Sequence, residues 1–413
     1  MLEEFIQSPV TRRRLLDGLA GPYVAEFAAW LHERGYTEIS IRGILKSLAA
    51  WTDWLGVSGL SLENAAQAVE ICADELKSTP KVLHARGPNR ASISAARNLV
   101  RFLQERNVVP TPKPAPSPAQ RWPLIGAFRS WMYQHRGLAE STLKLYEGVI
   151  VDLLQALGDD PQTYTALQLR TFVFERAQPH GLWRAKSIVV ASRAFLRFLG
   201  ATGRAPLGLE HALPTFSSRS LVSLPRFIEP AALERVIASC EPARLGRSRD
   251  RAVVLLLARL GLRAGEVARL QLGDIDWRRG RLTVSGKNRR PEWLPLPQEV
   301  GDAILDWLQT ERPSIEQPSV FTTVKAPHRP MSRAAVTHVV RGAFRRAGVQ
   351  SPVNGAHALR HSAATAMLRE GASLAGVGAV LRHRAPGTTA LYAKVDMGLL
   401  SEIAQPWPGE ASC

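Results

Sequence analysis

The sequence predicts a multidomain, mainly helical protein that ends in an α+β region with a small three-stranded antiparallel sheet. The chain has 413 residues, too many for one compact core, and 45% of them are hydrophobic, which is enough for several cores. Apolar residues recur at helical spacing through most of the chain. Strict alternation of apolar and polar residues is confined to a short stretch after Gly273.

Two segments rich in proline or serine divide the chain. Residues 110–120 contain the string PTPKPAPSP, whose prolines fix φ, lack an amide donor and favour an extended strut. Residues 213–226 form a looser linker, after which Pro230 can open a helix at its first turn. These linkers predict three domains and a tail, at residues 1–109, 121–212, 227–396 and 397–413.

The first two predicted domains resemble each other. The string from Phe27 to Trp30, FAAW, matches FRSW at 128–131, and RNLVRFL at 97–103 matches RAFLRFL at 193–199. The copies are about a hundred residues apart, far more than the period of a solenoid, so we expect a duplicated domain. Helical spacing of apolar residues in both copies predicts a bundle of four or five helices in each.

The third predicted domain begins with helices and then changes pattern. The apolar run 252–262 is too short to span a bilayer and predicts a buried helix. Strands are expected at 274–277, 281–285 and 292–296, with a basic turn between the last two. Helical spacing returns from Ser332 onward, so this region should be mostly helical with an exposed basic hairpin tip.

Charge and cysteine usage restrict the class of protein. The chain has 53 Lys and Arg against 36 Asp and Glu, a net charge of +17, which suits a polyanionic partner; a basic surface that is merely solvated is the alternative. Its three cysteines lack CxxC spacing, so they predict neither a disulfide framework nor a zinc site and fit a reducing cytoplasm. The acidic N-terminus lacks a hydrophobic signal core, and we expect an intracellular protein with no membrane association.

Six residues in the third domain suit phosphodiester chemistry when taken together: Arg263, Lys287, His357, Arg360, His383 and Tyr392. Each alone has an ordinary structural explanation; Arg263, for instance, can simply pair with Glu266 three residues on. As a set, two guanidinium groups can clamp a phosphate, a tyrosine can attack it and a lysine can protonate the leaving oxygen. With no acidic triad or Cys–His ligand set, we expect no metal and no cofactor.

Four motifs in this region resemble those of the tyrosine recombinases, the family of phage-type integrases. They are LGLRAGEVARLQLGDIDW (260–277), TVSGKNRRPEWLPLP (283–297), HALRHSAATAML (357–368) and LRHRAPGTTALYAKVD (381–396). The last motif places the tyrosine nine positions after the histidine, as the family does. The ending YAKVD…PWPG also resembles the large integrases of transposon-like elements that work as sets of recombinases.

The resemblance implies a mechanism. Tyr392 would attack the scissile phosphate to form a 3′-phosphotyrosyl link, Lys287 would be the general acid, and a partner's 5′-hydroxyl would reseal the strand without a nucleotide cofactor. The residues implied to stabilise the transition state are Arg263, His357, Arg360 and His383, with Glu266 supporting Arg263. The two helical regions would be SAM-like core-binding domains, and the second of them, with the catalytic domain, would clamp the duplex.

The resemblance also implies partners: double-stranded DNA, a tetramer of this chain on DNA, and companion recombinases or accessory DNA-bending proteins, in the nucleoid of the cytoplasm. The tail 397–413 would dock on a neighbouring protomer, and the first helical copy would bind further DNA or pack against a neighbour. The residues expected to contact DNA are Arg193, Arg197, Arg289, Arg290, Arg382 and Arg384. Arg382 stands where the family commonly has glycine, so it contacts phosphate or crowds the site.

Two alternatives stay open at this point. A type IB topoisomerase uses similar arginine, lysine, histidine and tyrosine chemistry but relaxes supercoils as a monomer without a defined partner site. A catalytically silent DNA-binding protein on the same scaffold would have no need for Tyr392. The core-binding copies and the tail favour the recombinase over the topoisomerase, and the complete set of catalytic side chains argues against the silent protein.

Overall fold

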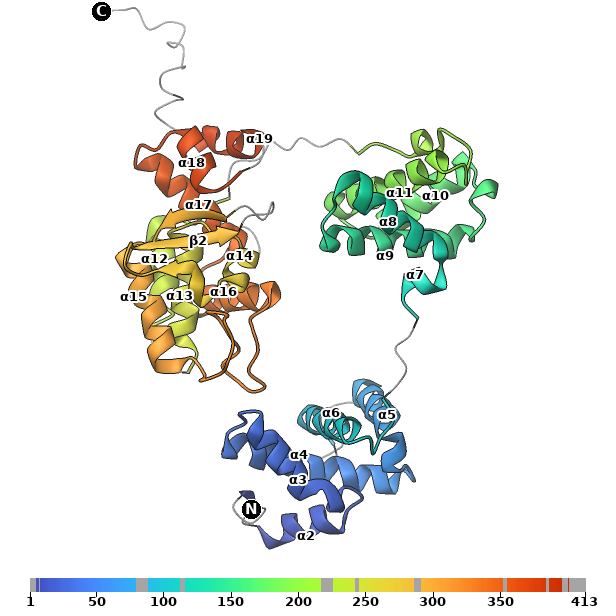
Figure 1. Ribbon diagram of the computed structural model, residues 1–413, viewed down its shortest axis with the longest axis vertical. Coiled ribbons are helices and arrows are strands. Elements are labelled where there is room, and N and C mark those ends of the chain that lie inside the picture. Colours follow the sequence, from blue (N-terminus) through green and yellow to red (C-terminus); the bar gives the residue numbers. More distant parts are fainter. Residues whose placement is uncertain are drawn as a thin grey trace, which may run out of the picture. The chain divides into compact units, whose positions relative to one another are not determined.

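The computed structural model describes residues 5–6, 8–78, 88–111, 116–216, 226–241, 245–285, 291–351, 355–383, 386–395 and 400. These residues form three regions, each with a hydrophobic core of its own, and each region is described by itself (Figure 1). The chain is mainly helical, as predicted. No helix among the described residues is both long enough and apolar enough to cross a membrane.

The N-terminal region is a helical bundle around an aromatic core. The ring of Phe102 lies 5.7 Å from that of Phe27 and 5.9 Å from that of Trp30, and Trp51 is fully buried nearby in the same core. Its elements are α2 (Pro9–Asp17), η1 (Gly21–Tyr23), α3 (Val24–Glu33), α4 (Glu38–Val57), η2 (Leu62–Asn64), α5 (Ala65–Ser78) and α6 (Arg90–Glu105).

The second region is also a helical bundle, and its core holds a comparable aromatic group. The ring of Phe198 lies 5.7 Å from that of Phe128 and 5.8 Å from that of Trp131. Its elements are α7 (Pro118–Arg121), α8 (Pro123–Arg136), α9 (Glu140–Leu157), η3 (Pro161–Thr163), α10 (Ala166–Ala177), α11 (Leu182–Ala201) and η4 (Leu209–Ala212).

The short helix α7 begins inside the segment 110–120, where the prolines predicted extended chain. Pro118 occupies the first helical position, where the missing amide hydrogen costs nothing. Ser117 caps the helix by accepting a hydrogen bond from the amide of Gln120, whose side chain in turn bonds to the Ser117 amide. The capping residues therefore outweigh the proline pattern at this end of the segment.

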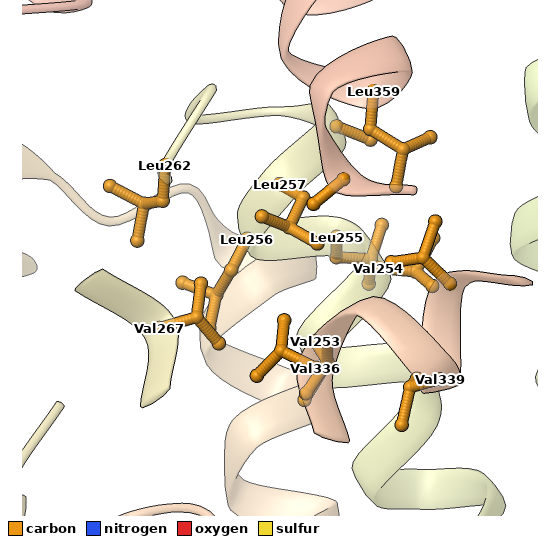
Figure 2. Packing of buried hydrophobic residues seen from close by; sticks show 14 of the residues in the cluster. Val253, Val254, Leu255, Leu256, Leu257, Leu262, Val267, Val336, Val339 and Leu359 are labelled. Carbon is orange, nitrogen blue, oxygen red and sulfur yellow. The ribbon is translucent and has the colours of Figure 1, made fainter. Parts of the chain in front are cut away.

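The C-terminal region is built around one buried helix, α13. Val253 to Leu257 are fully buried, and Figure 2 shows them packed among Val267, Val336, Val339 and Leu359 of the surrounding helices. The prediction of a buried helix in this apolar run is confirmed. The helices of the region are α12 (Pro230–Ala238), α13 (Arg247–Ala258), α14 (Ala264–Arg269), η5 (Leu272–Asp274), α15 (Gln298–Asp306), the π-helical turn η6 (Trp307–Glu311), α16 (Arg333–Ala347), α17 (Ala356–Arg369), α18 (Leu374–Val380), α19 (Pro386–Thr389) and η7 (Ala390–Val395).

The predicted three-stranded antiparallel sheet is confirmed, with the order β1-β2-β3. The strands are β1 (Ile275–Asp276), β2 (Arg281–Ser285) and β3 (Pro291–Pro295). Leu282 of β2 pairs with Ile275 on one side and Leu294 on the other, and all three side chains are buried on one face. The basic turn with Lys287, Arg289 and Arg290, which joins β2 to β3, lies outside the described residues.

Candidate active site

Helix α17 carries the centre of the site. It begins after Gly355, whose φ of +74° suits glycine, and its first two turns present His357, Arg360 and His361. Arg360 is only 4% exposed, and its guanidinium donates hydrogen bonds to the carbonyl oxygens of Gly261 and Leu381. Burial and the charge of Arg263 lower the pKa of Arg360 to about 10, so it stays charged at neutral pH.

Arg263 caps the N-terminus of α14 and is held by Glu266. Its amide donates to Oε2 of Glu266 at 2.8 Å and its guanidinium donates to Oε1 at 2.7 Å. Burial alone would raise the pKa of Glu266, but these hydrogen bonds and the charges of Arg382 and Arg263 lower that pKa below its ordinary value. The Arg263 side chain is 37% exposed, so it is far more open to solvent than Arg360.

Arg382 turns inward to the same carboxylate. Its backbone has a φ of +56°, the left-handed conformation that glycine adopts readily, and its side chain is 2% exposed. The guanidinium donates to Oε2 of Glu266 at 2.7 Å and to the carbonyl of Val380 at 2.9 Å. The guanidinium is thus enclosed and paired with Glu266, and a DNA contact by Arg382 stays a prediction.

Tyr392 lies in η7 with its ring buried in a small apolar cluster that includes Leu368 and Leu381. The residue is 2% exposed, and its hydroxyl is 2.7 Å from Nδ1 of His361. Burial raises the pKa of Tyr392 to about 12, against the opposing effect of the positive charge of Arg360. The DNA-free protein therefore holds this tyrosine as a neutral phenol.

His383 also lies beside the tyrosine ring. The two rings are nearly parallel, with centroids 6.3 Å apart, and Nδ1 of His383 is 2.8 Å from Oγ1 of Thr389. Burial, followed by the charges of Arg360 and Arg263, lowers the pKa of His383 to about 4. Its imidazole is accordingly neutral at pH 7.

His361 is a site residue that the sequence reasoning missed. Burial, together with His357 and Arg360, lowers its pKa to about 4, so it too is neutral at pH 7. The signal was present in the motif HALRHSAATAML, because His361 follows His357 by four positions and must share its face of α17. The rings of these two histidines lie 5.9 Å apart.

The structure thus brings together Glu266 and five of the six predicted reactive residues: Arg263, His357, Arg360, His383 and Tyr392. Lys287, Arg289, Arg290 and Arg384 lie outside the described residues. Among the residues that are described, no three His, Cys, Asp or Glu side chains are arranged to hold a metal ion.

Arg193 and Arg197, predicted to contact DNA, lie on α11 of the second region. Arg193 donates hydrogen bonds to the carbonyls of Leu213 and Pro214 and to the hydroxyl of Thr215, so it secures the start of the following linker. Arg197 is exposed on the same helix. A DNA contact by either residue stays a prediction.

A buried tyrosine beside two arginines and neutral histidines, in a helical domain with a three-stranded sheet, defines the class of enzyme that cuts DNA through a tyrosyl link. The sequence profile of the Phage integrase family matches residues 226–398. The chain is 35% identical over 419 residues to the Sinorhizobium fredii (strain NBRC 101917 / NGR234) protein named as an integrase/recombinase, y4rA, covering 99% of this chain and 100% of that one. The chain belongs to this family of tyrosine recombinases and phage integrases.

Solved structures share the fold at low sequence identity. The XerH site-specific recombinase, in its post-cleavage complex with a palindromic difH substrate, aligns with a TM-score of 0.56 at 16% identity, over 86% of this chain and 95% of XerH. A lambda integrase (75–356) dimer bound to a COC′ core site aligns with a TM-score of 0.51 at 16% identity, over 70% of this chain and 98% of that one.

Proposed function

We propose that this chain is a site-specific recombinase that cuts and rejoins double-stranded DNA through a 3′-phosphotyrosyl link at Tyr392. The observation that carries the proposal is the setting of Tyr392, whose hydroxyl is bonded to a neutral histidine and lies within the field of Arg360. The net charge of +17 suits the polyanionic substrate. Its place of work would be the nucleoid in the cytoplasm, where that substrate lies.

The side chains divide the reaction between them. Arg263 and Arg360 bind the non-bridging oxygens and stabilise the charge that develops on phosphorus. His357 and His383 donate hydrogen bonds to the same oxygens, and Lys287 protonates the departing 5′-oxygen. Glu266 keeps Arg263 in place, since it bonds to both its amide and its guanidinium. The reverse reaction, attack by a 5′-hydroxyl on the phosphotyrosine, uses the same groups and needs no nucleotide.

We also propose that the N-terminal region, residues 1–109, is a second copy of the SAM-like core-binding domain at 121–212. In both regions two helices are followed by a short 3-10 turn and two more helices. The aromatic groups around Phe102 and Phe198 have similar ring separations at positions that the sequence comparison aligned. The N-terminal copy, residues 1–109, would bind DNA beside the crossover site.

A DNA footprint tests this role for the N-terminal copy. We expect the footprint of the full chain to be longer than that of a chain lacking residues 1–112. An unchanged footprint would remove the DNA-binding role and leave packing against a neighbouring subunit, which a change in the size of the protein–DNA complex would reveal.

For strand exchange we propose a tetramer on DNA, linked by the tail 397–413 of each protomer. A groove of about 750 Å³ beside His383 supports this arrangement. Leu374, Ala375, Ala379 and Ala390 supply apolar lining among its described residues. This lining suits the apolar tail residues Leu399, Leu400 and Ile403, which lie at helical spacing in the sequence. Deleting the tail should leave dimers or monomers on DNA, as measured by light scattering.

Covalent trapping in cells tests the main proposal. Wild type and Tyr392→Phe are expressed, the cells are denatured, and protein-linked DNA is recovered and its ends are sequenced. We expect adducts that require Tyr392 and gather at one short, partly palindromic sequence. Tyr392-dependent adducts scattered over the genome would instead identify a topoisomerase. Equally few adducts from both proteins would mean either that the chemistry needs a partner absent from those cells or that the scaffold only binds DNA.

A further inference from the structure

The nucleophile proposed above has one direct hydrogen-bond partner among the described side chains, and that partner is His361 rather than any histidine assigned to phosphate binding. Nδ1 of His361 is 2.7 Å from the hydroxyl oxygen of Tyr392. The ring of His357 lies 5.9 Å from that of His361, and Nδ1 of His383 bonds to Thr389 rather than to Tyr392.

We propose that His361 is a further catalytic residue, which holds the hydroxyl of Tyr392 and accepts its proton when the oxygen attacks phosphorus. The inference rests on the proposed function, since it assumes that Tyr392 is the nucleophile. It assigns the nucleophile's proton to a group that touches the reacting atom in the structure.

The proton balance closes over one cycle. In cleavage the O–H bond of Tyr392 breaks, its proton moves to Nδ1 of His361, the oxygen bonds to phosphorus, and the 5′-oxygen leaves with a proton from Lys287. In ligation the 5′-hydroxyl attacks, returns its proton to the lysine amine, and the phenol oxygen leaves with the proton held by His361. The enzyme therefore ends the cycle in its starting protonation state, with no co-reactant.

The surroundings of His361 explain why the transfer waits for DNA. Burial, His357 and Arg360 lower the pKa of His361 to about 4, while burial raises the pKa of Tyr392 to about 12. In the free protein the proton consequently stays on the phenol. A bound phosphodiester brings negative charge next to these groups and to His383, which raises the proton affinity of the imidazoles.

The test uses the full-length chain and a duplex carrying the cleavage sequence mapped by covalent trapping. Single-turnover adduct formation is measured for wild type, His361→Phe, which keeps an aromatic ring but no acceptor, and His361→Asn, which keeps an acceptor near the position of Nδ1. Thermal midpoints show that each variant folds. We expect the phenylalanine variant to be slower by about 100-fold or more and the asparagine variant to fall between it and wild type.

A second duplex, with a 5′-bridging sulfur at the scissile phosphate, separates proton removal from Tyr392 from protonation of the leaving group, because a thiolate leaves without a proton. Lys287→Ala should regain speed on this duplex, whereas His361→Phe should stay slow. On the same duplex the wild-type rate should fall in acid as His361 is protonated, and His361→Asn should lose that dependence.

Four results would be decisive against these proposals. Wild-type speed in His361→Phe, or its recovery on the sulfur duplex, overturns the role of His361 and leaves the recombinase intact. A pH profile shared by wild type and His361→Asn also overturns that role. Absence of a wild-type adduct overturns the proposed function itself, and the role of His361 with it.

Discussion

Replacing Arg382 with glycine tests how the site is held together. Arg382 and Glu266 form an ion pair at 2.7 Å with both side chains 2% exposed. Removing one partner of a buried pair typically costs ~3–5 kcal/mol, because the remaining charge is left without its partner. Glu266 keeps its two bonds from Arg263, so the loss should lie at the lower end of that range.

The backbone acts in the opposite direction. Arg382 has a φ of +56°, and a non-glycine residue in this conformation costs ~1 kcal/mol relative to glycine. The buried Nε of Arg382 has no hydrogen-bond partner, so its removal also relieves a small penalty. We therefore expect Arg382→Gly to lower the free energy of unfolding by ~2 kcal/mol, or the thermal midpoint by ~4–8 °C for a region of this size.

Arg382→Ala is the matched control, because it loses the same ion pair without the conformational relief. It should be less stable than the glycine variant by ~1 kcal/mol. Calorimetry of the full-length chain measures the midpoints, and hydrogen exchange identifies residues 226–398 as the part that shifts. A glycine variant as stable as wild type would refute the contribution of the ion pair. An alanine variant as stable as the glycine variant would refute the argument from the left-handed backbone.

Three further outcomes are expected. The pKa values of His361 and His383 are about 4 in the folded chain against ~6.5 when unfolded. The contribution of these two histidines to the free energy of unfolding should therefore be fully present above pH ~6.5 and be lost toward pH ~4, as the unfolded chain binds protons. Calorimetry should show a shallower dependence of stability on pH in His361→Phe, and an unchanged dependence would contradict this. Gly261→Ala would place a Cβ 2.5 Å from a leucine methyl, whereas Gly280→Ala, also at positive φ, meets open space. Gly261→Ala should therefore lower the free energy of unfolding by ~1–3 kcal/mol more than Gly280→Ala does, and its thermal midpoint should be the lower of the two. Equal midpoints would show that no clash exists. Thr389→Val removes the hydrogen bond to His383 and should slow adduct formation ~10-fold with little change in midpoint, whereas an unchanged rate would mean that the bond does not position His383.

Most of the fold could be predicted because it rests on local patterns. The nearly continuous apolar run 252–262 indicates a buried helix, and the alternation around Leu282 indicates the sheet. The site could be predicted as a set of residue types at characteristic spacings. The inward orientation of the Arg382 side chain could not be predicted from the sequence. It depends on the carboxylate of Glu266, which is 116 positions away and becomes a neighbour only in the folded protein. The bond between His361 and Tyr392 is likewise a product of tertiary packing, across 31 positions.

The position of Arg360 bears on how such chains diverge. Its guanidinium joins the carbonyl of Gly261, ahead of α14, to that of Leu381, after α18, so its loss would leave two main-chain acceptors inside the protein without their partner. Tyr392, by contrast, can become phenylalanine while its ring stays packed. A lineage that abandons strand cleavage but still binds DNA should therefore change its tyrosine early and keep this arginine. In a distant relative the arginine would then be a sign of an intact scaffold, and the tyrosine a sign of a working enzyme.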